Sequence, residues 1–339
     1  MEFNYSTEFS DSLVQEWRSL FDTGLTKVPF LRPEYLQIWW QTRGGGEWPD
    51  SAQLVLITAR EAGKLVGLAP CFVAERDGKR SLLLLGAIEV SDYLDLVVSA
   101  DRVDAFARGF VEYVKTHLAT ELKINQISLD NILEQSPSIQ ALQQASLELG
   151  LQSEINPLER APYITLNGNY EDYLARLDKK QRHEIRRKMR RLQELPTPTR
   201  WYIASDPAKL DEEIDEFLRL MAYDPQKVAF LTDKMKDQMR LSMKDAFTAG
   251  YLQLVFLCIG EARVAAYLNF DFGNNIYVYN SGMNPEYFEH SPGWVLLGYL
   301  LQWANENQRS EFDFMRGTED YKYKFGGVDR QVMRVSIQL

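Results

Sequence analysis

Residues Leu252–Ser281, with the sequence LQLVFLCIGEARVAAYLNFDFGNNIYVYNS, indicate consecutive β-strands. Apolar, β-branched and aromatic residues dominate three runs, at Leu252–Ile259, Arg263–Phe272 and Asn275–Ser281. The glycine-containing pairs that separate these runs suit tight turns. The pattern next predicts a helix at Gly293–Asn307 and a strand at Phe312–Met315. Strands interleaved with helices indicate an α/β protein.

The first half of the chain repeats part of this pattern. Leu54–Ala69 is similar to Leu254–Leu268, since each contains a strand, a turn and a second strand with small residues. We interpret this as an internal duplication. A length of 339 residues also suits two domains. We therefore expect one domain at residues 1–155 and another at residues 156–339, with a linker at Asn156–Pro162 at the start of the second.

The composition excludes several classes of protein. The net charge of −10 argues against a DNA partner, and the three histidines lack the spacing of metal ligands, so we expect no metal. Met1–Asp11 lacks the pattern of a signal peptide, and the apolar runs are too short to span a membrane. These features predict a soluble, cytoplasmic protein.

Two loops carry most of the candidate chemistry. In the first, Ser291, Pro292 and Gly293 stand where a helix begins, and the free N–H groups of a helix start can bind phosphate. The structural alternative is an ordinary helix start with Ser291 as its cap. The second loop lies within Asp313–Gly327, which combines tyrosine, lysine and glycine after a strand. Its tyrosines could protonate a leaving group and its lysines could bind an anion, whereas a surface hairpin or short helix is the alternative.

Two further segments carry charge that could bind a substrate. A long helix is expected at Tyr170–Leu195, and its basic part, Lys179–Arg191, could bind an anionic substrate or simply be a solvated face. Arg182, Arg186 and Arg190 are four residues apart and would share one side of that helix. In the first half, the loop Glu89–Asp95 contains Asp92, which could accept hydrogen bonds from sugar hydroxyls, although an acidic turn is the commoner explanation.

These segments, in this order, resemble GNAT-superfamily acyltransferases of the CelD and FemAB-like type. The resemblance rests on Tyr173–Leu192, Tyr279–Glu286, Ser291–Leu297 and Phe312–Phe325, and it is looser in the first half. It implies two tandem GNAT-like domains, each with a mixed, mostly antiparallel sheet flanked by helices. It also implies that acyl-CoA is the donor.

The resemblance assigns roles to particular residues. The donor would lie against Asn280, Ser281, Met283, Ser291, Gly293 and Trp294. Tyr321, Tyr323 and Lys324 are the implied catalytic residues. The substrate-binding candidates are Arg182, Arg186, Arg190, Arg316, Lys322 and Asp92.

Three functions remain open at this point. The first is an acyl-CoA-dependent N- or O-acyltransferase that acts directly on a sugar, polysaccharide or cell-envelope precursor. The second is a FemAB-like peptidyltransferase that uses aminoacyl-tRNA, which the basic helix would suit. The third is a non-catalytic partner in exopolysaccharide assembly. The alternatives stay open because the usual GNAT phosphate loop is richer in glycine, and here only Gly293 remains beside Pro292, which lacks an N–H.

Overall fold

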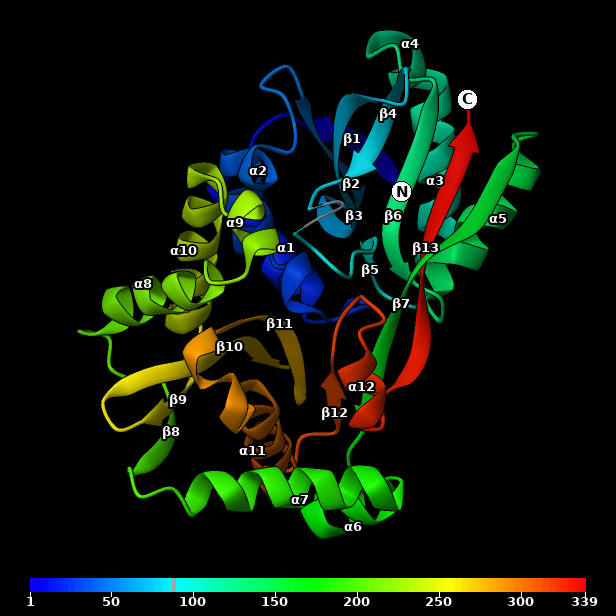
Figure 1. Cartoon of the computed structure of the whole chain (residues 1–339). Coiled ribbons are helices and arrows are strands. Elements are labelled where there is room, and N and C mark those ends of the chain that lie inside the picture. The colour runs from blue at the N-terminus through cyan, green and yellow to red at the C-terminus, as the bar shows by residue number, and fades with distance from the viewer. Residues whose placement is uncertain (87–89) are drawn as a thin grey trace. The chain divides into compact units, whose positions relative to one another are not determined.

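The computed structural model describes residues 1–86 and 90–339, so Glu89 of the acidic loop lies outside the described residues. The chain divides into two compact units (Figure 1). Unit 1 contains Met1–Arg160 and Arg330–Leu339, and unit 2 contains Ala161–Asp329. The last ten residues, which follow the second half in sequence, therefore belong to unit 1.

Unit 1 is built on a sheet with the strand order β1-β2-β3-β4-β6-β13, followed by the first part of β7. β4 and β6 are parallel, whereas β1 to β4 pair antiparallel in sequence order and β13 is antiparallel to β6. A short strand, β5, pairs with β3. The strands are β1 (Glu2–Ser6), β2 (Gln53–Glu61), β3 (Lys64–Arg76), β4 (Lys79–Leu84), β5 (Val97–Val98), β6 (Gln126–Leu133), β7 (Ser153–Thr165) and β13 (Val328–Gln338). The helices are α1 (Asp11–Phe21), η1 (Pro29–Leu31), α2 (Pro33–Gly46), α3 (Val103–Tyr113), η2 (Val114–Leu118), α4 (Ala119–Glu121) and α5 (Pro137–Glu148).

Unit 2 has the strand order β8-β9-β10-β11-β12, followed by the last part of β7. Only the β11·β12 pair is parallel, and the other pairs are antiparallel. The strands are β8 (Thr199–Ile203), β9 (Leu252–Ile259), β10 (Ala262–Phe272), β11 (Asn275–Met283) and β12 (Glu311–Asp313). The helices are α6 (Tyr170–Arg176), α7 (Lys179–Gln193), α8 (Leu210–Met221), α9 (Pro225–Phe230), α10 (Asp233–Thr248), η3 (Pro285–His290), α11 (Pro292–Glu306) and α12 (Asp320–Lys324).

The two units repeat one strand order. In each unit, four antiparallel strands are followed by helices and then by a fifth strand parallel to the fourth. An antiparallel sixth strand, β13 in unit 1 and the last part of β7 in unit 2, pairs with this fifth strand. The β2·β3 and β9·β10 hairpins occupy equivalent places, as their similar sequences predict. The mixed α/β fold is therefore confirmed.

Two local predictions are wrong. The segment expected to be a linker, Asn156–Pro162, is part of strand β7. Proline lacks only the N–H, and the carbonyl of Pro162 still accepts a hydrogen bond from the amide of Phe314 at 2.9 Å. The helix expected at Tyr170–Leu195 is broken into α6 and α7, because the side chain of Asp178 accepts from the amide of Lys180 and starts a new helix.

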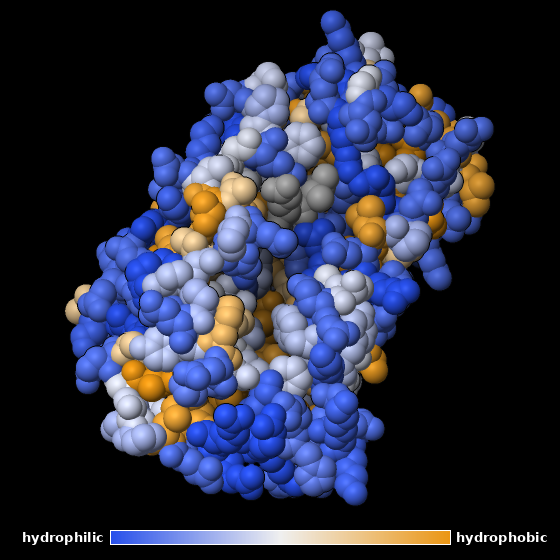
Figure 2. Space-filling model, in the orientation of Figure 1, coloured by the Kyte–Doolittle hydropathy of each residue, from blue (hydrophilic) through white to orange (hydrophobic). Residues whose placement is uncertain are grey.

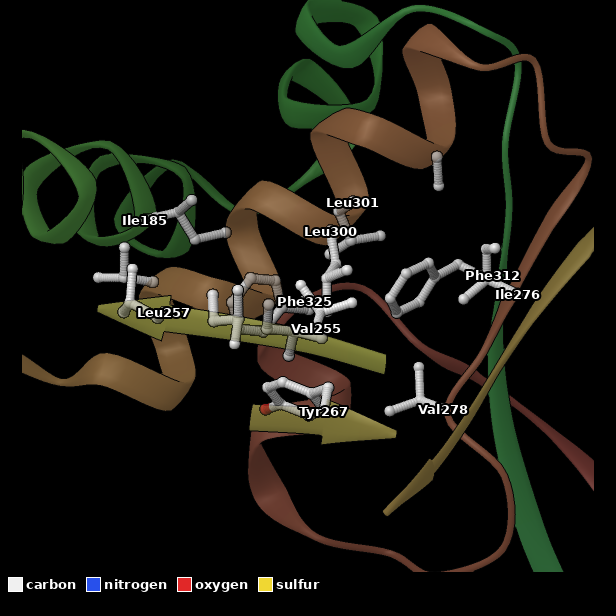
Figure 3. Close-up of a cluster of buried hydrophobic side chains, with 14 of the residues drawn as sticks. Ile185, Val255, Leu257, Tyr267, Ile276, Val278, Leu300, Leu301, Phe312 and Phe325 are labelled. Atoms are coloured by element: carbon white, nitrogen blue, oxygen red, sulfur yellow. The ribbon is translucent and has the colours of Figure 1, made fainter. Parts of the chain in front are cut away.

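The core of unit 2 lies between its sheet and the helices α6, α7 and α11 (Figure 3). Ile185 of α7 and Leu300 and Leu301 of α11 pack against apolar side chains of β9, β10 and β11. Phe325, directly after α12, belongs to the same cluster. This packing holds α7, α11 and α12 on the sheet and so fixes the surroundings of the candidate site. Among the residues that the structure describes, no helix is long and apolar enough to cross a membrane.

Candidate functional site

β11 and β12 diverge soon after they begin. The two strands pair only from Asn275 opposite Glu311 to Tyr277 opposite Asp313. β12 ends there, whereas β11 continues to Met283 and stays paired to β10. The register between β10 and β11 shifts at Tyr279, which is bulged out of the ladder. Backbone groups of β11 beyond Tyr277 therefore face an opening where β12 no longer provides partners.

Tyr321 of α12 lies close to this opening. Its ring contacts Phe314, just after β12, edge-on with the ring centroids 6.1 Å apart. It packs against the apolar cluster. Burial raises the pKa of the nearby Tyr267 of β10, and the proximity of Tyr321 adds to that rise. Burial, with a smaller contribution from the charge of Glu319, raises the pKa of Tyr321 well above its usual value. Within the described ranges, no hydrogen-bond partner of the Tyr321 hydroxyl is found, so this proton remains available.

Lys322, one residue further on, holds the preceding loop together. Only 2% of its side chain is exposed, and Nζ donates to the carbonyl oxygens of Met315 (3.2 Å), Arg316 (2.6 Å) and Gly317 (3.2 Å). Nζ also lies 2.9 Å from Oε2 of Glu319. An ammonium has three hydrogens, so this lysine is already saturated. Lys322 was expected to bind substrate, but its side chain is buried beneath the loop Met315–Gly317 that precedes it.

The other candidates on α12 point elsewhere. The hydroxyl of Tyr323, which is 37% exposed, donates to Oδ1 of Asp329 at 2.8 Å. Lys324 pairs with Asp320 one helical turn earlier at 2.8 Å, where both side chains are exposed. Arg316 is half-buried in the loop that Lys322 holds. The structure thus separates Tyr321 from Tyr323, because residues two apart on a helix face different sides, and the ammonium of Lys324 is bound to Asp320.

Helix α11 begins after η3, the short helix that follows strand β11. Ser291 adopts a left-handed conformation, with φ 51° and ψ 51°, and its side chain makes no capping bond. In the described part of the chain, the amides of Gly293 and Trp294 have no acceptor. A Cβ on Gly293 would lie 2.4 Å from Sδ of Met283, so this glycine allows Met283 to pack against the helix start. The first turn of α11 therefore presents free N–H groups.

Basic side chains of α7 surround this helix start. A small pocket of about 120 Å³ is lined by Arg187, Lys188 and Arg191 together with Glu289, His290 and Ser291. Glu184 pairs with Arg187 at 2.7 Å and with Lys188 at 3.5 Å, so the cations outnumber the carboxylates here by one. The Lys188 ammonium also lies 4.5 Å from the ring centroid of Trp294. A helix start and nearby cations together suit a phosphate or diphosphate group.

The arginine row expected to bind substrate is on the other flank of α7. Arg182 donates to the carbonyl oxygen of Ala175 at 3.2 Å, Arg186 pairs with Glu171 of α6, and Arg190 lies 3.7 Å from Glu194. Neither Arg182, Arg186 nor Arg190 lines the small pocket. Figure 2 shows the resulting hydrophilic band along α7 at the lower edge of the view.

Lys227 of α9 is a site residue that sequence reasoning missed. Its ammonium donates to Oδ1 of Asn280 at 2.9 Å and to the carbonyl oxygen of Ser281 at 2.5 Å. Oδ1 of Asn280 also accepts from the amide of Ser281 at 2.8 Å. Lys227, Ser281 and Met283 help to line a pocket of about 500 Å³ at the end of β11. No spacing in the sequence links Lys227 to Asn280, which lies in a strand beyond α10.

In the acidic loop of unit 1, the carboxylate of Asp95 has a structural role. Asp95 is fully buried and accepts hydrogen bonds from the hydroxyls of Thr26 (2.5 Å) and Ser136 (2.6 Å). Asp92 is half-buried in the same loop. In the described residues, no group of three His, Cys, Asp or Glu side chains is placed to hold a metal ion.

The fold and these features define a class of protein, the tandem GNAT-like α/β proteins, in which a parallel strand pair opens beside a helix start. Residues 179–323 match the family described as "Acetyltransferase (GNAT) domain". The chain therefore carries a GNAT acetyltransferase domain, which makes it a GNAT-type acyltransferase, and the resemblance noted in its sequence is confirmed.

Solved structures show the same fold along nearly the whole chain. The crystal structure of FemX has a TM-score of 0.67 at 10% identity and covers 99% of this chain and 97% of its own. A conserved protein of unknown function from Bacteroides thetaiotaomicron has a TM-score of 0.63 at 11% identity, over 100% of both chains. A tandem GNAT protein from the clavulanic acid biosynthesis pathway has a TM-score of 0.50 at 14% identity, over 98% and 97%. No curated protein matches the chain by sequence.

Proposed function

We propose that this chain is an acyl-CoA-dependent N- or O-acyltransferase that transfers the acyl group directly from the thioester to its acceptor. The observation that carries the proposal is the divergence of β11 from β12 after Tyr277 and Asp313. It leaves a stretch of β11 that β12 does not pair, within the same unit as an uncapped helix start. This combination suits a long, thin donor with a polar arm and a diphosphate.

Each part of the donor has a matching feature. Free amides at Gly293 and Trp294, with Arg187, Lys188 and Arg191 nearby, suit the phosphates. The backbone of β11 that β12 does not pair suits the amide groups of the pantetheine arm, except at Ser281, whose amide is bonded to Oδ1 of Asn280 and whose carbonyl is bonded to Lys227. The side chains of Asn280, Ser281 and Met283 would then border that arm.

The chemistry needs few protein groups. The acceptor nitrogen or oxygen attacks the thioester carbonyl, the C–S bond breaks, and the thiolate takes up a proton. The acceptor atom releases its own proton to solvent, from which the proton donor is restored, so no net proton is consumed. Backbone N–H groups at the opening would stabilise the oxyanion, and Tyr321 would supply the proton to the thiolate. Tyr321 suits this role because it is a protonated phenol without a hydrogen-bond partner in the described chain.

The identity of the acceptor is a separate proposal. Sugar, polysaccharide or cell-envelope precursors were expected from the sequence, and an amine or hydroxyl of any of them would suit direct transfer. The large pocket beside β11 has several apolar side chains, including Met283, Pro285 and Phe288, which favours an acceptor with an apolar part over a bare sugar.

Replacing Arg191 with alanine should weaken acetyl-CoA binding about fivefold at low salt, and less at high salt, because exposed charges are screened. Arg191 lines the small pocket at the start of α11. Arg190→Ala is the matched control, since its side chain is on the other flank of the same helix. Calorimetric titrations at two salt concentrations measure the effect. An equal loss of acetyl-CoA affinity in the two variants would contradict the placement of the donor phosphates beside Arg191.

The pH dependence of transfer should reflect the raised pKa of Tyr321. A phenol whose pKa is raised stays protonated, and so remains able to donate, when the pH passes the ordinary tyrosine value of about 10. With saturating substrates, kcat should therefore show no decline between about pH 8 and pH 10. A decline in that range, measured in wild type under conditions where the protein stays folded, would contradict Tyr321 as the proton donor.

The proposal as a whole is tested by titrating the protein with acetyl-CoA and, separately, with aminoacyl-tRNA. We expect saturable binding of acetyl-CoA at one site. Binding of the RNA without binding of acetyl-CoA would favour the FemAB-like function, and binding of neither would favour the non-catalytic role.

A further inference from the structure

Among the residues that the structure describes, Lys227 is a cation without a carboxylate partner. In the described part of the chain, no acidic side chain lies within salt-bridge distance of its ammonium, and both of its hydrogen-bond acceptors are neutral. The nearest acidic residue in sequence, Asp224, instead caps α9 by accepting from the amide of Gln226 at 3.0 Å. Burial lowers the pKa of Lys227, opposed by the charges of Asp224 and Glu319. A half-buried cation of this kind is poorly compensated until an anion binds.

Apart from Lys227 and Asp224, whose carboxylate caps α9, the side chains that line the pocket at the end of β11 are largely apolar. Its volume is about 500 Å³, and its apolar lining comes from Tyr223, Pro225, Met283, Pro285 and Phe288. Phe288 and Tyr223 are 58% and 40% exposed, which is unusual for large apolar side chains. Such side chains beside a concave site favour a ligand with an apolar or aromatic body. The volume suits a small molecule.

The pocket also borders the proposed reaction site. Ser281 and Met283, which line it, belong to the part of β11 that continues beyond β12. Lys227 bonds to the same stretch of strand through Ser281 and Asn280. A ligand held here would therefore lie next to the donor arm proposed for that stretch.

We infer that this pocket binds the acceptor, and that the acceptor is a small molecule with an apolar or aromatic body and a carboxylate that pairs with Lys227. The inference rests on the proposed function for the role of acceptor, and on the pocket itself for the ligand chemistry. Two hydrogens of the ammonium are used by Asn280 and Ser281, so the third is available for the carboxylate. An amine or hydroxyl on the same molecule would then attack the thioester.

The test compares 3-phenylpropionate with its amide, 3-phenylpropionamide, which has the same shape without the charge. Wild type should bind the acid about tenfold more tightly than the amide, the usual gain of one charge-assisted hydrogen bond. Lys227→Met should abolish that preference while leaving the affinity for the amide unchanged, and Lys227→Arg should retain it. Lys234→Met, an exposed lysine of α10 that does not line the pocket, is the matched control.

Equal affinities for acid and amide in wild type, a preference that survives in Lys227→Met, or no binding of either compound would overturn the inference. A thermal unfolding curve for each variant shows whether it is folded. Acetyl-CoA is titrated into the same samples. If acetyl-CoA binds and the acid does not, the pocket assignment fails and the proposed function stands; if the acid binds and acetyl-CoA does not, the reverse holds.

Discussion

Tyr321→Phe should lower kcat about 10²- to 10⁴-fold, the usual contribution of a positioned general acid. The substitution removes only the hydroxyl, so the ring should keep its edge-on contact with Phe314 and its place against the apolar cluster. The affinity for acetyl-CoA should be unchanged, since the proton is needed only when the thiolate leaves. Steady-state kinetics with a titration of acetyl-CoA measure both quantities.

Tyr323→Phe is the matched control for this prediction. It removes a hydroxyl from the same short helix, but that hydroxyl is bonded to Asp329 on an exposed side. We expect kcat within about twofold of wild type, because surface substitutions away from a site have small effects. A large loss in Tyr323→Phe with none in Tyr321→Phe would show that the wrong tyrosine has been assigned.

Lys322→Met should lower the free energy of unfolding by about 3 kcal/mol, because it leaves buried carbonyl groups without a donor. The carbonyls of Met315, Arg316 and Gly317 all accept from this one ammonium. Gly317 has φ 106° and Met315 has φ 62°, so the loop adopts a conformation that it would not keep without that anchor. Activity should fall as well, since Tyr321 follows this loop directly.

Lys324→Met is the control that distinguishes the loss of the Lys322 hydrogen bonds from the mere loss of a positive charge. Its ammonium makes one exposed pair with Asp320, which contributes little to stability. We expect a change of less than about 0.5 kcal/mol in the free energy of unfolding, measured by denaturant titration. If the two variants are equally stable, the anchoring role of Lys322 is wrong.

Three consecutive strands of unit 2, β9, β10 and β11, could be predicted from the sequence. The turns at Gly260-Glu261 and Gly273-Asn274 separate β9, β10 and β11 where expected, because tight turns and continuous apolar strand segments are local properties of the sequence. β7 could not be predicted, since the prolines within Asn156–Pro162 suggested a linker. The break at Asp178 was missed because helix-favouring residues continue on both sides of it.

The candidate site was harder to predict because tertiary contacts select among similar residues. The periodicity of α7 locates its apolar face at Ile185 and Leu192, with basic residues on both flanks. Only the folded structure shows that the flank with Arg187 and Arg191, and not the one with Arg186, lies beside the start of α11. Likewise Tyr321, Lys322 and Tyr323 are adjacent in sequence, and helix geometry gives each a different environment.

The most direct test of the donor site is hydrogen–deuterium exchange of the wild-type protein with and without acetyl-CoA. The amides of Tyr279–Met283 beyond the β11·β12 pairing, and those of Gly293 and Trp294 at the uncapped helix start, should become protected when acetyl-CoA binds. Peptides from α10 should exchange at the same rate in both samples. Absence of protection at these two segments under saturating acetyl-CoA, or protection confined to other parts of the chain, would contradict the account.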